Sequence, residues 1–244
     1  MKRLPILTIL FLVLTSSQNL ARASFLCPGC VPTVTETRAE IVARSDVVLL
    51  AQWADAKPVD GETAAFAEFQ VTLVGKDHTE TYKKDQRIRL DEYITADPGD
   101  LFLLTGTRDK EEVLKWDSPA EISEMGYHYV MQAPSPELPR HERLAYYLKF
   151  LEISDPFISN DAYNEFALAP FEAVVPLTDQ MPRKKLRKWL KNEDGKTTKT
   201  HIGLYGIMLG LCGEKEDAEL LRHLFADNPS EYAVGMEGIV TGYL

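Results

Sequence analysis

Apolar residues crowd the stretch from 200 to 213 so densely that they occupy nearly every face of a helix. A helix that is hydrophobic all round is buried by its neighbours, and this one is too short to cross a membrane. Gly203, Gly206 and Gly210 recur at helical spacing, which lowers helix propensity but lets neighbouring backbones come close. The pattern therefore predicts a central helix surrounded by other helices, followed by a second helix over 216–227.

Amphipathic patterns predict further helices around this central one. Residues 140–153 carry apolar side chains at i, i+3, i+4 and i+7, which is typical of a helix with one buried face. Shorter helices are predicted over 161–169, 170–175, 183–191 and 231–244. Short helices of this kind resemble HEAT-like repeats, in which each unit buries its apolar face against the next. The apolar carboxyl end favours a truncated chain or a docked partner.

Two patterns in the first half of the chain indicate β-strands: a continuous apolar run over 47–53, typical of an interior strand, and alternation of apolar and polar residues with a period of two in the segments 66–74 and 86–93. Strands are predicted over 47–53, 66–74, 86–93, 101–105 and 113–116. A short helix over 33–44 precedes them, and the capping-box pattern of 118–121 predicts another helix after them. Three prolines within 133–139 predict a linker.

The predicted fold class is therefore α+β. A small antiparallel, OB-like β-barrel over 24–132 is followed, after the linker, by a repeat-like α-helical domain over 140–244.

Several of these segments together resemble the netrin-like OB barrel shared with tissue inhibitors of metalloproteases. They are the Cys27/Cys30 motif, the short helix, Ser-Asp-Val-Val-Leu-Leu-Ala at 45–51, Val-Gly-Lys at 74–76, the strand over 87–90 and Gly-Asp-Leu-Phe-Leu-Leu-Thr-Gly at 99–106. The resemblance spans residues 27–116 and implies a five-stranded Greek-key barrel. Those inhibitors chelate the protease zinc through an amino-terminal cysteine, whereas Ser24 is the predicted first residue here. The resemblance therefore does not carry over the inhibitory chemistry.

The first 23 residues have the layout of a secretory signal peptide. Lys2 and Arg3 precede an apolar run over 4–14, and a small-x-small pattern ends at Ala23. Cleavage would leave an exported chain, periplasmic or secreted, that begins at Ser24 and has no membrane span; an uncleaved anchor is the alternative. The full chain has a net charge of −10, which repels phosphate backbones and anionic membranes and argues against a nucleic-acid partner.

Cys27 and Cys30 form a Cys-Pro-Gly-Cys motif close to the predicted cleavage point. Because an exported protein meets an oxidising compartment, a structural disulfide between them is the first interpretation. A bridge from one of them to Cys212, a redox-active thiol pair and a metal site are the alternatives. The redox alternative needs a strand before the motif, for which the sequence has no room.

Carboxylates are densest in one segment of the second half. The residues concerned are Asp155, Asp161, Glu165 and Glu172. Such a group can serve acid/base catalysis or hold a divalent cation. Capping of a helix start by Asp161 or its neighbours is the alternative.

Basic residues are densest in the segment that follows. The candidate patch consists of Arg183, Lys184, Arg187 and Lys188. Leu186, Trp189 and Leu190 between them recur at i, i+3 and i+4, which predicts a helix with a buried stripe and its charges outside. The patch is then either a solvated helix face or a docking surface for an acidic partner.

The sequence contains no nucleophile elbow, phosphate loop or dinucleotide fingerprint, and no cofactor is predicted. These observations favour an exported, non-catalytic interaction or scaffold protein with an unidentified protein partner. Two enzymatic alternatives remain: a metal-dependent hydrolase that uses the carboxylates between Asp155 and Glu172, and a thiol oxidoreductase at Cys27 and Cys30. The oligomeric state stays open.

Overall fold

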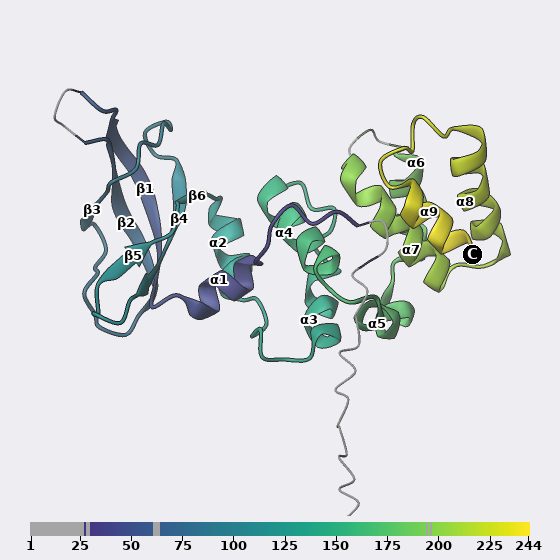
Figure 1. Ribbon diagram of the computed structural model, residues 1–244, viewed down its shortest axis with the longest axis horizontal. Coiled ribbons are helices and arrows are strands. Elements are labelled where there is room, and N and C mark those ends of the chain that lie inside the picture. The colour runs from purple at the N-terminus through teal and green to yellow at the C-terminus, as the bar shows by residue number, and fades with distance from the viewer. Residues whose placement is uncertain (1–26, 28–29, 61–63, 194, 196) are drawn as a thin grey trace, which may run out of the picture.

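The computed structural model describes residues 27, 30–60, 64–193, 195 and 197–244. A β-sheet stands at one end of the molecule and helices fill the other end; the chain passes along α4 (Pro156–Ala167) and through α1 (Arg38–Arg44) before it enters the sheet, and then returns through the other helices (Figure 1). The predicted signal peptide and Ser24 lie outside the described residues. Within the described residues, no helix is both long and apolar enough to span a membrane.

The first half forms one antiparallel sheet, as the alternating pattern predicted. Its strands are β1 (Val47–Lys57), β2 (Phe66–Asp77), β3 (Arg87–Leu90), β4 (Leu101–Arg108), β5 (Leu114–Trp116) and β6 (Ala120–Glu121). The strand order is β3-β2-β1-β4-β5, and β6 pairs with β4. The central strand β1 is buried from Val47 to Ala51, which explains why its sequence is continuously apolar.

The predicted closed barrel is not confirmed, because the sheet is open. In the part of the chain that the structure describes, no pairing joins β3 to β5. Strand β3 has only four residues and β5 only three, which is too short for backbone pairing to close the sheet into a barrel. Side chains nevertheless link the two ends of the sheet: Tyr82 contacts Trp116 edge to face at 5.6 Å, and Ser118 Oγ donates to Glu92 Oε1 at 3.1 Å.

The described residues form eleven short helices, two of which are 3-10 helices. They are α1 (Arg38–Arg44), α2 (Glu124–Met131), α3 (Arg140–Tyr147), α4 (Pro156–Ala167), α5 (Phe171–Val174), η1 (Val175–Gln180), α6 (Arg183–Lys191), η2 (Lys199–His201), α7 (Ile202–Cys212), α8 (Lys215–Asp227) and α9 (Met236–Tyr243). They confirm the helical character of the second half. The HEAT-like repeat stays a prediction.

Two helix starts differ from the prediction. Residues 118–121 end in strand β6 rather than opening a helix, and the cap of α2 is Ser123, whose hydroxyl accepts from the N–H of Gly126. Helix α4 begins at Pro156 instead of near residue 161, because Asp155 caps it and proline fits the first helical position.

Helix α7 is the buried central helix that the apolar run predicted. Its residues from Ile202 to Leu209 are all buried. Its glycines face those of α9, so closely that a Cβ atom at Gly238 would lie 2.1 Å from the Gly203 carbonyl oxygen. Small residues therefore set the approach of these two helices, as their spacing in α7 indicated.

One hydrophobic core runs through both halves of the molecule. Val48, Leu50 and Leu103 of the sheet belong to the same cluster as the buried side chains of α2, α4 and α7. The opposite face of the sheet has a smaller cluster of its own, built around Phe69 and Leu104. The predicted linker, residues 133–139, joins α2 to α3 beside this shared core.

Candidate functional site

Two of the four predicted acidic residues meet inside the molecule. Asp161 and Glu165 share one face of α4, and both are buried. The Asp161 carboxylate accepts from Tyr129 Oη at 2.9 Å and from the backbone N–H of Arg38 at 3.2 Å. Glu165 Oε2 accepts from Arg143 Nη2 at 2.8 Å, and Arg140 lies 3.4 Å away. The pair therefore joins α1, α2 and α3 to α4.

Burial changes the proton affinity of this cluster. The pKa of Asp161 is raised to about 6, chiefly because burial removes the carboxylate from water; the charge of Glu165 adds to the rise, whereas the hydrogen bonds from Tyr129 and the Arg38 backbone oppose it. Burial also raises the pKa of Tyr129 far above its usual value, so that it stays a hydrogen-bond donor.

The other two acidic residues lie elsewhere. Asp155 caps α4 through Oδ1, which accepts from two backbone N–H groups, and its Oδ2 accepts from Ser123 Oγ at 2.5 Å. Glu172 is exposed on α5. The interpretation of Asp161 as a cap is wrong, because it sits inside the helix. The described residues contain no group of three or more His, Cys, Asp or Glu side chains that could hold a metal ion.

A hollow at the junction of the sheet and the helices does gather acids from both halves. It has a volume of about 570 Å³ and contains Asp100, Glu121 and Asp155 among its lining residues. Asp155 is already committed to its cap and to Ser123. The Asp155 carboxylate therefore caps a helix in this hollow and does not form an acid/base pair.

The two amino-terminal cysteines are joined by a disulfide, with their Cα atoms 5.4 Å apart. Cys27 is buried and its backbone N–H donates to Ala169 at 3.2 Å. After the bridge the chain runs along α4, where Tyr163 Oη accepts from the Val31 N–H at 3.0 Å (Figure 1). No helix follows the motif before Arg38. These surroundings favour a structural disulfide over a reactive thiol pair. Cys212 is a free cysteine and does not take part in the bridge.

The predicted basic patch divides into paired and unpaired charges. Arg183 Nε lies 2.5 Å from Asp217 Oδ2, and Arg187 Nε lies 3.3 Å from Asp217 Oδ1. Lys184 and Lys188 are exposed, and neither has an ion pair within the described part of the chain. These two lysines, together with the exposed Lys185, are therefore the available charges of this helix.

Two hollows flank α6 and share Pro182 and Lys185. The α6 hollow, of about 410 Å³, is lined by Pro182, Arg183, Lys184, Lys185 and Arg187. The α3–α6 hollow, of about 480 Å³, is lined by Ala145, Leu148, Lys149, Glu152, Ile153, Gln180, Pro182, Lys185 and Trp189. The first is basic, whereas the second combines an apolar wall with charges of both signs.

A polar network that the sequence did not reveal lies behind the α3–α6 hollow. Tyr205 Oη donates a short hydrogen bond to Glu152 Oε1. His201 Nδ1 lies 3.2 Å from Tyr205 Oη and 3.5 Å from Glu152 Oε1. The ring of Tyr163 stacks on His201 at 4.2 Å. Nothing in the sequence pairs Glu152 with His201, because they meet only once α7 is packed in the core.

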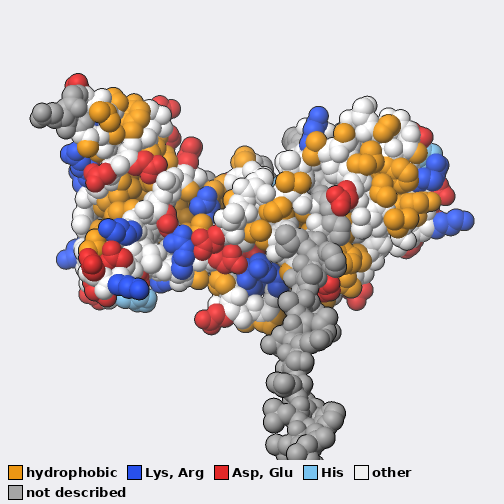
Figure 2. All heavy atoms as spheres, in the orientation of Figure 1, with side chains coloured by type: hydrophobic (Ala, Val, Ile, Leu, Met, Phe, Trp, Pro, Cys, Tyr) orange, Lys and Arg blue, Asp and Glu red, His pale blue; other side chains and the backbone are white. Residues whose placement is uncertain are grey.

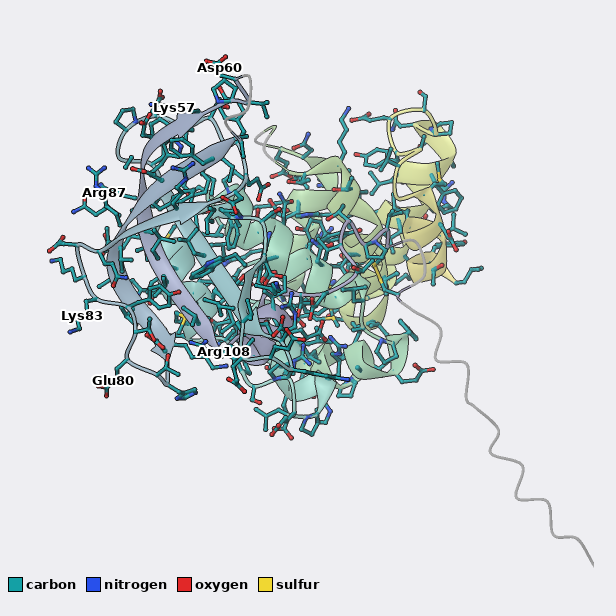
Figure 3. The ribbon with its side chains drawn as sticks, turned by 60° about the vertical axis from the view of Figure 1, so that its left-hand side comes forward. Lys57, Asp60, Glu80, Lys83, Arg87 and Arg108 are labelled. Atoms are coloured by element: carbon teal, nitrogen blue, oxygen red, sulfur yellow. A yellow bond between two sulfur atoms is a disulfide. The ribbon has the colours of Figure 1, made fainter. Side chains whose placement is uncertain are left out.

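Charges elsewhere on the surface are of mixed sign. On the side of the sheet away from the helices, Lys57, Asp60, Glu80, Lys83 and Arg87 point outward without forming a patch of one sign (Figure 3). The face seen in Figure 2 likewise intersperses acidic and basic side chains, and its hydrophobic side chains gather over α8 and α9. The basic face of α6 stands on a chain whose net charge is −10.

The fold and these sites define an α+β protein in which an open antiparallel sheet shares its core with a helical half. The chain matches no protein-family model, no curated protein and no solved structure at a significant level.

Proposed function

We propose that the chain is an exported, non-catalytic interaction protein that binds an acidic segment of a protein partner through the basic face of α6. The observation that carries this proposal is the pair of exposed, unpaired lysines, Lys184 and Lys188, on a chain of net charge −10. A cationic face of this kind attracts acidic partners over a range of about 10 Å at ordinary salt.

The neighbouring α6 hollow supports this proposal. Its lining residues are basic apart from Pro182 and include no acidic side chain. An acidic side chain of the partner that enters this hollow meets the charges of Lys184 and Lys185. The negative charge of the rest of the chain disfavours nucleic acid as the occupant.

The enzymatic alternatives have weaker support. Asp161 and Glu165 are buried and already bonded, so they are not open to a substrate. Cys27 is buried and disulfide-bonded. Export is supported by the disulfide, because such bonds persist in oxidising compartments. Mass spectrometry of the native protein tests export: the expected amino-terminal residue is Ser24, and an uncleaved Met1 end would contradict it.

The interaction is tested with the full mature chain and a fluorescent acidic peptide in which glutamates alternate with leucines. We expect anisotropy titrations to show binding that weakens with added salt. The Lys184→Glu/Lys188→Glu variant should bind about tenfold more weakly or worse, since it reverses two charges at the site.

A matched variant controls for net charge. Lys83→Glu/Lys110→Glu reverses two exposed lysines on the sheet half and should leave peptide affinity unchanged. Equal losses in both variants would show that only the total charge matters, and would refute the α6 site.

A further inference from the structure

The α3–α6 hollow holds a second binding chemistry, distinct from that of the basic α6 face. We propose that it binds a zwitterion that carries an ammonium group and carboxylates, as a free acidic amino acid or the acidic amino terminus of a peptide does. The argument starts from Glu152, the one acidic side chain among the lining residues.

Glu152 offers a carboxylate oxygen to a cationic group in the hollow. Its Oε1 is held by Tyr205, but its Oε2 has no hydrogen bond or ion pair within the described residues. The side chain is 14% exposed and lines the hollow, so its carboxylate is partly desolvated. Charge attraction is stronger there than in bulk water.

Trp189 adds a second reason to expect an ammonium group. It lines the same hollow, and its ring lies 5.0 Å from that of Tyr205, centroid to centroid. An indole face beside a carboxylate attracts cations through both the ring quadrupole and the charge. Leu148 and Ile153 complete the apolar wall against which a short aliphatic stem can pack.

The carboxylates of the ligand would pair with two lysines that line the hollow. Lys149 and Lys185 line the hollow, are exposed, and have no ion pair in the described part of the chain. Gln180 adds an amide to the lining. The two lysine ammonium groups can pair with the two carboxylates of an acidic amino acid. This pairing selects an acidic amino acid over a simple amine.

The network behind the hollow fixes the orientation of Glu152 before a ligand arrives. Tyr205 is fully buried and donates to Oε1, and His201 lies on the same side. Burial beside Glu152 keeps the pKa of Tyr205 well above its usual value, so that its hydroxyl stays protonated and keeps donating. A carboxylate held in this way loses little conformational entropy on binding.

The experiment is calorimetric titration of the full mature chain with three probes. They are L-glutamate, N-acetyl-L-glutamate and a hexapeptide that begins with glutamate and has a free amino terminus. We expect saturable binding of L-glutamate or of the hexapeptide with a Kd of about 1 mM or tighter, and at least about tenfold weaker binding of the acetylated probe. Tighter binding of the amino acid identifies a small-molecule site, and tighter binding of the hexapeptide identifies a peptide-terminus site.

Variants separate this site from the α6 face. Glu152→Gln keeps an oxygen that accepts from Tyr205 but removes the charge, and should weaken binding of the free-amine probes about tenfold without changing that of N-acetyl-L-glutamate. Lys149→Gln should weaken all three probes, whereas Lys191→Gln, on the same helix as Lys185 but outside the hollow, should weaken none. A melting temperature close to that of the wild type confirms that each variant is folded.

Two outcomes would overturn the inference: no saturable binding of L-glutamate or of the hexapeptide, or binding that is insensitive both to N-acetylation and to Glu152→Gln. The inference does not depend on the proposed function: Lys185 lines both hollows, but Lys184 and Lys188 do not line the α3–α6 hollow and Glu152 does not line the α6 hollow, so Lys184→Glu/Lys188→Glu and Glu152→Gln test the two sites separately.

Discussion

The buried polar side chains of α4 show how a single residue can set a solution property of the whole protein. Asp161 is only 8% exposed and receives a tyrosine hydroxyl and a backbone amide, but no cation bonds to it directly. Arg143 instead forms an ion pair with Glu165, in which Nη2 lies 2.8 Å from Oε2. Ionised Asp161 is therefore poorly compensated, which is the physical reason for its raised pKa.

This residue predicts a fall in stability with rising pH. In the unfolded chain the carboxyl ionises near 3.8, whereas in the folded protein it keeps its proton up to about 6. Between these values the folded state binds more protons, so the free energy of unfolding decreases as the pH rises, by up to about 3 kcal/mol. Urea unfolding at pH 4, 5, 6 and 7 measures the slope.

Asp161→Asn should remove most of that slope, because an amide keeps hydrogen-bonding partners for Tyr129 and Arg38 without a charge to bury. The exposed Asp179→Asn serves as control and should leave the slope as it is. A variant Asp161→Asn with the slope of the wild type would assign the pH dependence to other groups.

The sequence grouped four acids, of which only Asp161 and Glu165 meet, and it did not predict the partners of that pair. The spacing of Asp161 and Glu165 correctly places them on one helix face. Their partners Tyr129, Arg143 and the Arg38 amide come from three other elements, and no local pattern announces them. The cap was expected at Asp161 or its neighbours, but Asp155 caps α4, with Pro156 at the first helical position.

At the level of elements, the crossing of α7 and α9 is the most constrained contact in the helical half. A Cβ atom added at Gly206 would lie 2.7 Å from Ile239 Cα, and one at Gly210 would lie 2.1 Å from the Gly242 carbonyl oxygen. The obstacles are backbone atoms, which cannot rotate away as a side chain can. The glycines therefore fix the distance between these helices.

Gly238→Ala should destabilise the protein by about 3 kcal/mol or more, at the upper end of overpacking costs, because its methyl group meets the Gly203 backbone at 2.1 Å. Thermal unfolding followed by circular dichroism measures the loss. The exposed Glu237→Ala, on the same helix, is the control and should change stability by less than about 0.5 kcal/mol. Equal stability of the two variants would mean that α9 moves away from α7 without cost.

Elements with a strong local signal were predicted well, and those that depend on distant partners were not. The apolar run of α7, the continuous apolar runs of β1 and β4 and the alternation of β2 and β3 led to the correct element types. Closure of the barrel depends instead on whether β3 and β5 are long enough to pair, which alternation over a few residues does not determine. The α3–α6 hollow had no sequence signal, since its lining comes from segments up to several helices apart.

At the level of the whole molecule, the sequence suggested two parts and the structure joins them through a common core. Leu103 lies in the sheet, yet it belongs to the same apolar cluster as Tyr147 and Leu204 of the helical half. Hydrogen bonds also attach the amino-terminal segment to the helical half, because the N–H and the hydroxyl of Thr33 both donate to the Asn164 side chain in α4. Loss of packing on one side therefore exposes apolar surface on the other.

The shared core predicts one cooperative unfolding transition, and tryptophans report on each half. Trp53 and Trp116 lie in the sheet, and Trp189 lies on α6. In urea, the fluorescence of a Trp189→Phe variant and of a Trp53→Phe/Trp116→Phe variant should each show a single transition. Leu103→Ala, added to either, should lower both midpoints together, since emptying this buried site costs about 2–5 kcal/mol.

The exposed Leu138→Ala is the matched control and should leave both midpoints in place, because its side chain is 44% exposed. If Leu103→Ala shifted the sheet tryptophans alone, residues 133–139 would separate two independently folding domains, as their prolines predict. A joint shift would instead mean that binding at the α6 face or in the α3–α6 hollow stabilises the sheet as well, since any ligand of the native state stabilises everything that unfolds with its site.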